Sequence, residues 1–376
     1  VGVRTARHRG PVLSTALVGD SRPPLSGNRG VLVAGEALFD FLPSTTRSGE
    51  SCFLPKAGGS PFNVCIAARR LGLPVHFFGG LSTDLFGEEL YAQLDREFVD
   101  LSLTRRADRP STLAFVSETP GKDVRYAFFK ENTADRCLSI ANAERACETI
   151  TSPGAVHVSL GAITFEDEIM EAVFSALFSS ARERGAFTVF DPNVRGNMIA
   201  GTPEEYSAKV ENFLGLVDVA KASDADVEFL YGASASMESV ARRWLELGPS
   251  LVVITMGPKG AAAFFRAGDD VASVAVEPPV QQPMTIDASG KAAPVADTVG
   301  AGDTLTGALL YGLLGGGDRL SLAPQAAGTA AWDEAAQATL EAVLRAAVTA
   351  ASISVSRSGC DPPTADDVEG ALSALN

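Results

Sequence analysis

The stretch best suited to chemistry runs from Asp297 to Leu310, with the sequence DTVGAGDTLTGALL. A turn containing Gly300 and Gly302 leads into a run with helical apolar spacing, so the first backbone N–H groups of that helix lack intrahelical partners. The helix dipole adds partial positive charge at the same place, which predicts an anion site suited to phosphate. Asp303 would repel a phosphate. It is therefore either a helix cap or a group that takes a proton or organises a cation.

Two common nucleotide-binding motifs do not describe this turn. The string GxxxxGK[ST] occurs nowhere in the chain, and GxGxxG fails because Gly307 comes too late. The stretch instead resembles the C-terminal signature of the ribokinase-like (PfkB) carbohydrate kinases. The resemblance implies that Asp303 is the catalytic base. It also implies that the transferring phosphate is held by Gly300, Ala301 and Gly302.

A second motif, Gly58-Gly59-Ser-Pro-Phe-Asn63, precedes a short helix that ends at Gly72. Adjacent glycines allow a close approach of the backbone to a ligand, and an Asn side chain can both donate to and accept from a sugar hydroxyl. By itself, GGxxxN is often only a turn. It resembles the N-terminal signature of the same family, in which the glycines and the Asn hold the sugar, so Gly58, Gly59 and Asn63 are expected to bind substrate.

Three further residues are candidates for the substrate site. Asp40 follows the first apolar run, where open α/β sheets bind ligands, and is otherwise a solvated turn acid. Arg195 ends Asp191-Pro-Asn-Val-Arg195, which resembles the DPNxR of fructokinase-type members; it contacts substrate or phosphate, or pairs with a nearby acid. Lys130 stands where relatives often carry a basic lid residue, and is otherwise an exposed strand lysine.

The same resemblance implies a nucleotide site and a cation site. The TxGxxG string from Thr255 matches the nucleotide turn of the family, and Ser223 with Asp226 stands where many relatives carry NxxE, a motif tied to magnesium and phosphate. The residues expected at ATP are Asn193, Lys221, Ser223, Thr255, Gly257 and Gly260. Asp226 is expected at Mg²⁺, which phosphates and water would largely hold. A monovalent cation, K⁺, is expected at the backbone of Asp297, Val299, Ser354, Arg357 and Gly359.

Apolar runs alternate with helical patterns from residue 150 onward, which predicts an α/β fold with a doubly wound, mainly parallel sheet flanked by helices. Two β-prone runs flank Pro120-Gly121 and predict a hairpin. The resemblance implies a ribokinase-like fold in which a small β lid, from about 41–56 and 111–130, covers the sugar. We expect one carbohydrate kinase domain over 30–376.

Composition narrows the setting. A net charge of −15 argues against nucleic acid or an anionic membrane as the main partner, and no apolar run is long enough to span a bilayer. Five cysteines without CxxC spacing predict free thiols, and therefore a cytoplasmic location. Residues 1–29 carry five arginines and one acid and are expected to form a disordered basic tail. A transit peptide is the alternative for this segment.

The predicted activity is ATP-dependent phosphorylation of a sugar hydroxyl, with sugar and ATP as the small-molecule partners. The segments around Asp40 and Arg195 look more like fructokinases than ribokinases, which favours D-fructose converted to fructose 6-phosphate. A 2-keto-3-deoxygluconate kinase and other hexose or nucleoside kinases of the family remain open. From another class, a non-catalytic kinase-like scaffold is the alternative. Among relatives an exposed β lid is a common dimer surface, so a homodimer through the lid is also expected.

Overall fold

The computed structural model describes residues 30–375, except 118–124, 150–153, 162–164, 166, 197–198, 200, 282 and 317–320. The predicted basic tail and the predicted Pro-Gly turn therefore lie outside the described residues. The predicted α/β architecture is confirmed. Within the described residues no helix has both the length and the hydropathy needed to cross a bilayer.

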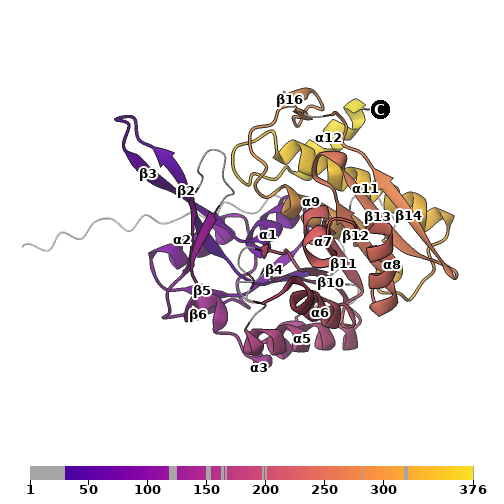
Figure 1. The fold of residues 1–376 in the computed structure, drawn as a ribbon, viewed down its shortest axis with the longest axis horizontal. Helices are drawn as coiled ribbons and strands as arrows, with labels where there is room; N and C mark the ends of the chain where they lie inside the picture. Colours follow the sequence, from indigo (N-terminus) through magenta and orange to yellow (C-terminus); the bar gives the residue numbers. More distant parts are fainter. Residues whose placement is uncertain are drawn as a thin grey trace, which may run out of the picture.

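The central sheet runs through the middle of the molecule (Figure 1). In sheet order its described strands are β14 (Asp270–Val276), β13 (Ala261–Ala267), β12 (Leu251–Thr255), β11 (Val219–Ser223), β10 (Phe187–Asp191), β9 (Ala155–Ser159), β1 (Val31–Ala34) and β4 (Val75–Phe78). From β12 to β4 all neighbours are parallel, whereas β13 pairs antiparallel with both β12 and β14. That edge hairpin was not predicted from the sequence.

Helices cover both faces of the sheet, which explains why its strands read as short apolar runs. One face carries α1 (Ser60–Arg70), α2 (Leu85–Arg96), α9 (Ala301–Leu313), α11 (Glu334–Ser354) and α12 (Ala365–Leu375). The other carries α3 (Ile140–Cys147), α5 (Glu168–Glu183), α6 (Pro203–Leu214), α7 (Asp224–Tyr231) and α8 (Met237–Leu247). Side chains alternate along β1, so Val31 and Val33 join the first hydrophobic cluster and Leu32 joins the second.

A four-stranded lid projects from one end of the molecule (Figure 1). Its strands, in sheet order, are β3 (Ser51–Gly58), β2 (Leu38–Thr45), β7 (Thr112–Ser117) and β8 (Arg125–Phe129). The antiparallel pairing of β7 with β8 confirms the predicted hairpin strands. Strand β2 begins at Leu38, so Asp40 lies inside the lid and not at the end of β1. Smaller described elements are β5 (Gly80–Ser82), β6 (Arg105–Ala107), β15 (Met284–Ile286), β16 (Ala292–Pro294) and α10 (Ala323–Ala326).

Helices α1 and α9 pack closely, and this contact sets up the site. A Cβ atom added to Gly307 of α9 would lie only 2.7 Å from the Cβ of Ala67 in α1. Any larger residue at this crossing would push the helices apart. The start of α1 therefore lies beside the start of α9, near the edge where the parallel strands end.

Candidate active site

Two cavities meet at the turn before α9. A polar cavity of about 890 Å³ lies between the lid and the strand ends, and a mostly apolar pocket of about 250 Å³ lies beside it. Gly302 and Thr298 line both cavities. The predicted anion loop therefore stands at the junction of two compartments, and Asp303 lines the polar one.

The turn has the geometry of an anion site. Gly300 is the N-cap of α9 with a φ of 75°, and no side chain caps the helix there. Ala301 N–H donates to Thr298 O at 3.3 Å, and no described side chain accepts from the N–H groups of Gly302 and Asp303. A Cβ on Gly300 would also lie 2.3 Å from the Sγ of Cys360, so both backbone conformation and space require glycine.

The carboxylate of Asp303 is held from α1 and does not cap its own helix. Ser60 Oγ donates to Oδ1 at 2.6 Å, and Asn63 Nδ2 donates to Oδ2 at 2.8 Å. Burial has the largest effect and raises the pKa of Asp303. The two donors and Lys221 oppose this rise only in part. Each oxygen accepts one hydrogen bond and keeps a second lone pair for a substrate hydroxyl.

Lys221 supplies positive charge beside the loop. Its Nζ lies 2.8 Å from Asp191 Oδ2, and both side chains are buried. A Cβ placed on Gly302 would lie 3.6 Å from this Nζ, so the ammonium faces the predicted phosphate site. Burial alone would lower the pKa of Lys221, but Asp191 and Asp226 outweigh it and raise the pKa, which keeps the ammonium charged.

Ser223 and Asp226 form a capping box at the start of α7. Asp226 Oδ2 accepts from Ser223 N at 2.7 Å, and Oδ1 accepts from Val194 N at 3.0 Å. Because backbone donors already occupy both oxygens, Asp226 can offer a metal only a remaining lone pair. Among the described residues no group of three or more His, Cys, Asp or Glu side chains could hold a metal ion.

The predicted sugar-binding residues gather in the polar cavity. Asp40, Gly58, Gly59, Asn63 and Arg195 all line it. A Cβ on Gly58 would lie 2.7 Å from Asp40 Oδ2, so this glycine makes room for the carboxylate. Burial raises the pKa of Asp40 to about 6 despite the opposing charge of Arg195. The Oδ1 atom of Asn63 is buried and has no hydrogen-bond partner among the described residues.

Lys130 is not among the residues that line this cavity; it lies one residue beyond β8. A lid cation that does line the cavity is Lys56 of β3. In the strand register Lys56 lies opposite Asp40 of β2. Glu36 is also a buried lining residue. Sequence reasoning did not single out Lys56 as a site residue, although the alternation of β3 places it on the same lid face as Gly58.

The expected nucleotide turn lies at the apolar pocket. Thr255, Gly257 and Gly260 contribute to its wall at the turn after β12, opposite apolar side chains such as Leu305 and Val348. Asn193 and Ser223 line the polar cavity instead, with Lys221. The expected ATP residues therefore span both compartments around the loop.

The expected cation loop is made from two segments joined by Asp297. Its Oδ1 accepts from Val299 N and its Oδ2 from Gly359 N, each at 3.0 Å. Asp297, Val299 and Gly359 line the polar cavity, whereas Ser354 and Arg357 do not. The carbonyl of Ser354 accepts from Arg357 N at 3.0 Å.

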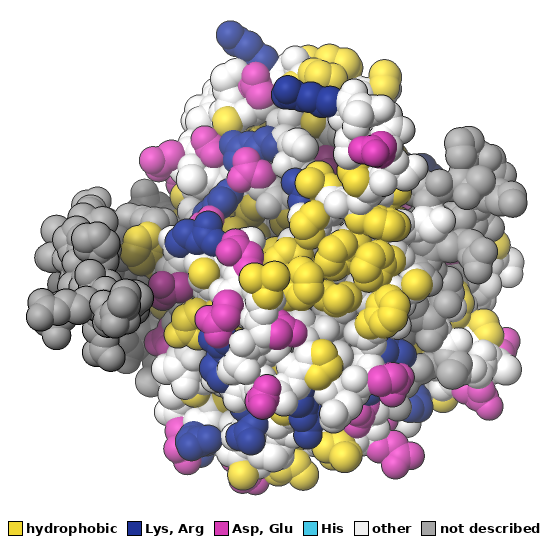
Figure 2. All heavy atoms as spheres, turned by 90° about the vertical axis from the view of Figure 1, so that its left-hand side faces the viewer, with side chains coloured by type: hydrophobic (Ala, Val, Ile, Leu, Met, Phe, Trp, Pro, Cys, Tyr) yellow, Lys and Arg dark blue, Asp and Glu magenta, His cyan; other side chains and the backbone are white. Residues whose placement is uncertain are grey.

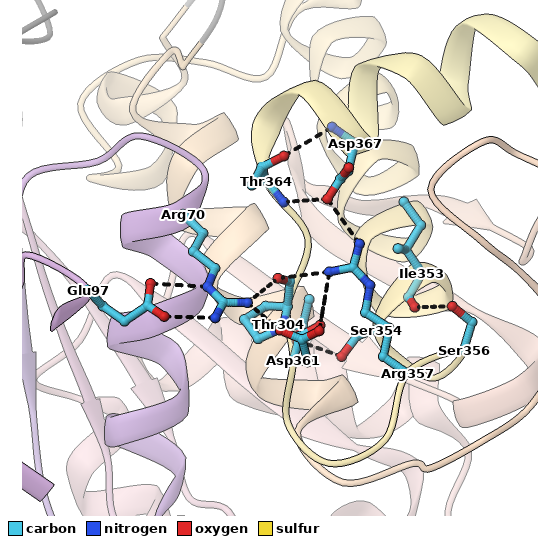
Figure 3. A network of polar contacts seen from close by, with 11 residues as sticks. Arg70, Glu97, Thr304, Ile353, Ser354, Ser356, Arg357, Asp361, Thr364 and Asp367 are labelled. Atoms are coloured by element: carbon cyan, nitrogen blue, oxygen red, sulfur yellow. Dashed lines mark hydrogen bonds and ion pairs between the residues drawn. The ribbon is translucent and has the colours of Figure 1, made fainter. Parts of the chain in front are cut away.

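Two arginines anchor the second segment of this loop (Figure 3). Arg70 of α1 pairs with Glu97 and Asp361 at 2.7 and 2.5 Å, and Arg357 bonds Asp367 of α12 at 3.0 Å. The side chain of Arg357 therefore points into this network. The network fixes the path of the chain that carries Gly359 and Cys360 into the cavity.

An anion loop and a buried carboxylate between an apolar pocket and a lidded polar cavity define a phosphotransferase for a small hydroxylated molecule. The match to known families agrees. A model described as "pfkB family carbohydrate kinase" matches residues 28–367, and the chain belongs to that family.

A relative supports the assignment, and two solved structures share the fold. A fructokinase of Rhizobium leguminosarum bv. trifolii is 34% identical over 287 residues, which are 75% of this chain and 79% of the relative. ATP-bound fructokinase from Xylella fastidiosa has a TM-score of 0.74 at 23% identity, covering 92% of this chain and 98% of that one. A Vibrio cholerae O395 fructokinase double mutant with fructose, ADP and potassium ion has a TM-score of 0.69 at 24% identity, covering 93% and 99%.

Proposed function

We propose that this protein transfers the γ-phosphoryl group of ATP to D-fructose and forms fructose 6-phosphate. The observation that carries the proposal is the position of Asp303. Its carboxylate lines the polar cavity at the N-terminus of α9, where that cavity meets the apolar pocket. The fructokinases among the relatives support fructose as the acceptor.

The chemistry follows from this placement. The adenine would occupy the apolar pocket, and the triphosphate would reach the N–H groups of Gly300, Gly302 and Asp303. Asp303 would accept the proton of the sugar hydroxyl while the hydroxyl oxygen attacks the γ-phosphorus. The bond between the γ-phosphorus and the oxygen that bridges it to the β-phosphate would break, and ADP would leave. Lys221 would neutralise charge that develops on the transferred group. The lid would exclude water from the cavity.

Two ions complete the proposal. Mg²⁺ would be coordinated by ATP phosphates and water, with Asp226 beside it, and would neutralise phosphate charge. K⁺ would be held by backbone carbonyls of the 297–299 and 354–359 segments. The potassium ion in the Vibrio cholerae structure supports this choice of cation.

A neutral polyol suits the cavity better than a sugar acid. Asp40 lines the cavity, and its carboxylate oxygens are acceptors for hydroxyl groups. Lys56 and Arg195 could instead serve the carboxylate of a keto acid, which is the second candidate. Arg195 faces Asp40 closely enough to lower the pKa of that carboxyl, so its charge is already partly balanced. This pairing favours fructose.

We further propose a homodimer formed through the lid. Phe53 and Phe129 are 51% and 61% exposed, and each packs edge-on against Phe115. Figure 2 shows a continuous hydrophobic patch on the face of the molecule that carries the lid. Apolar patches of this kind mark protein interfaces.

The direct test is product formation by the purified protein. With Mg-ATP and K⁺, D-fructose should yield ADP and fructose 6-phosphate in equal amounts, with the phosphate position identified by ³¹P–¹H NMR. Asp303→Asn is the control for contaminating kinases. ATP binding without turnover on any sugar of a broad panel would contradict the kinase proposal and favour a scaffold.

A further inference from the structure

Ser60 makes the shortest contact to Asp303 and comes from a different helix. Its hydroxyl, at the first residue of α1, donates to Asp303 Oδ1 at 2.6 Å, and its residue is 7% exposed. Behind it, the fully buried Ser159 at the end of β9 donates to Ser60 Oγ at 3.0 Å. Two successive hydrogen bonds therefore connect the central sheet to the carboxylate.

The order of donation fixes what Ser60 can do. A hydroxyl has one hydrogen, and Ser60 accepts from Ser159, so its own hydrogen is directed to Asp303. A donor directed at a carboxyl favours the ionised form over the protonated form. Asn63 Nδ2 does the same at the other oxygen, 2.8 Å away. The carboxylate is thereby oriented by two donors from α1.

The surroundings of Asp303 also include groups that favour its protonated form. Burial and the buried charge of Asp191 on β10 both raise the pKa of Asp303, whereas Lys221 on β11 lowers it. Burial also raises the pKa of the Cys360 thiol, which stays neutral beside the carboxylate. A general base in such a place needs hydrogen-bond donors to stay deprotonated at neutral pH.

We propose that Ser60, held as a donor by Ser159, is a positioning residue that keeps Asp303 ionised and aimed at the sugar hydroxyl. The proposal deepens the proposed kinase function and rests on it. Ser159 is fully buried, so the pair ends inside the protein and does not form a proton exit. Its role is to orient and to tune the base.

The test compares pH profiles of kcat for the wild type, Ser60→Ala and Ser159→Ala, with the best sugar of the panel. Losing a donor to a charged group raises the pKa of the base, so the acid limb should move up by about one pH unit in Ser60→Ala. The turnover loss should then be roughly tenfold below the limb and smaller at alkaline pH. Ser159→Ala should shift the limb in the same direction by less.

Ser175→Ala is the matched control, because Ser175 makes a local hydroxyl-to-backbone bond to Glu171 O in the remote helix α5. It should leave the profile unchanged. A second readout needs no turnover: the ¹³C carboxyl titration of Asp303, identified by its loss in Asp303→Asn, should show a higher midpoint in Ser60→Ala. An unchanged limb or midpoint in a folded Ser60→Ala protein would overturn the proposal. An inactive wild type would count against the kinase function instead, and the NMR midpoint would still decide the role of Ser60.

Discussion

Asp303 lies at the turn where we propose that phosphate binds, and the buried ammonium of Lys221 faces the same turn. We expect Asp303→Asn to keep the hydrogen bonds from α1 in part while removing the proton acceptor. Turnover should fall by about 10²–10⁴-fold, the usual contribution of a general base. ATP affinity, measured by calorimetry, should change little. A mutant with more than about a tenth of wild-type kcat would exclude the base role.

Asp40 links substrate binding to stability. Its pKa in the folded protein is about 6 against an ordinary 3.8, so the ionised carboxylate costs stability above pH ~6, and that cost disappears as the pH falls toward ~4. Asp40→Asn should therefore raise Tm at about pH 8, less the loss of attraction to Arg195, and leave Tm nearly unchanged at about pH 4.

The same substitution should raise the KM for the sugar and spare the KM for ATP, because Asp40 belongs to the lid and does not line the apolar pocket proposed for adenine. Differential scanning fluorimetry and initial-rate kinetics on one preparation would check both effects. A lower Tm at alkaline pH, or equal changes in both KM values, would contradict this account of Asp40.

At the scale of elements, the turn before α9 depends on glycine for two reasons. Gly300 has a φ of 75°, and a Cβ there would lie 2.3 Å from Cys360 Sγ. Gly232 at the end of α7 has a φ of 84° but open space around its Cβ position. Gly300→Ala should therefore reduce kcat strongly, whereas Gly232→Ala should carry only a backbone cost of about 1 kcal/mol.

The two variants separate strain from crowding. Circular dichroism and Tm would show comparable folding, and the kinetics should differ by at least an order of magnitude. Equal activity in the two variants would mean that the loop does not need the geometry seen here.

The elements that sequence could predict are those with local signals. The sequence predicts the apolar strands β1, β9 and β12 and the glycine turn before α9. It also predicts the two motifs that contain Asn63 and Asp303. The sequence does not predict the contact between those motifs, because the contact depends on how α1 crosses α9 at Gly307. Asn63 therefore turned out to hold Asp303 as well as face the cavity.

Strand pairing explains the other features that the sequence did not predict. The edge strands β13 and β14 are alanine-rich or partly polar, so their periodicity is weak. Lys56 reaches the cavity because β3 pairs with β2 in a register that sets it opposite Asp40. Which face of the β2–β3 hairpin covers the cavity depends on tertiary packing, and the expectation for Lys130 rests on resemblance alone.

At the scale of the whole molecule, the two faces of the lid carry different side chains. Its inner face carries Asp40 and Lys56 to the cavity, and Phe53 and Phe129 are exposed. If the lid forms the dimer, Phe53→Ser with Phe129→Ser should convert a dimer to a monomer in analytical ultracentrifugation. Leu85→Ser is the control, since Leu85 is 79% exposed at the start of α2. A monomeric wild type would refute the dimer.

The activity that we propose for this fold and this site is that of a fructokinase. The most direct measurement is a comparison of kcat/KM for D-fructose, D-ribose and 2-keto-3-deoxygluconate at saturating Mg-ATP and K⁺. A site that bonds particular hydroxyls discriminates strongly against a substrate that lacks them. We predict that fructose is preferred by at least about tenfold over both competitors. A higher kcat/KM for the keto acid would show that Lys56 and Arg195 serve a carboxylate, and it would contradict the fructokinase assignment while leaving the sugar kinase in place.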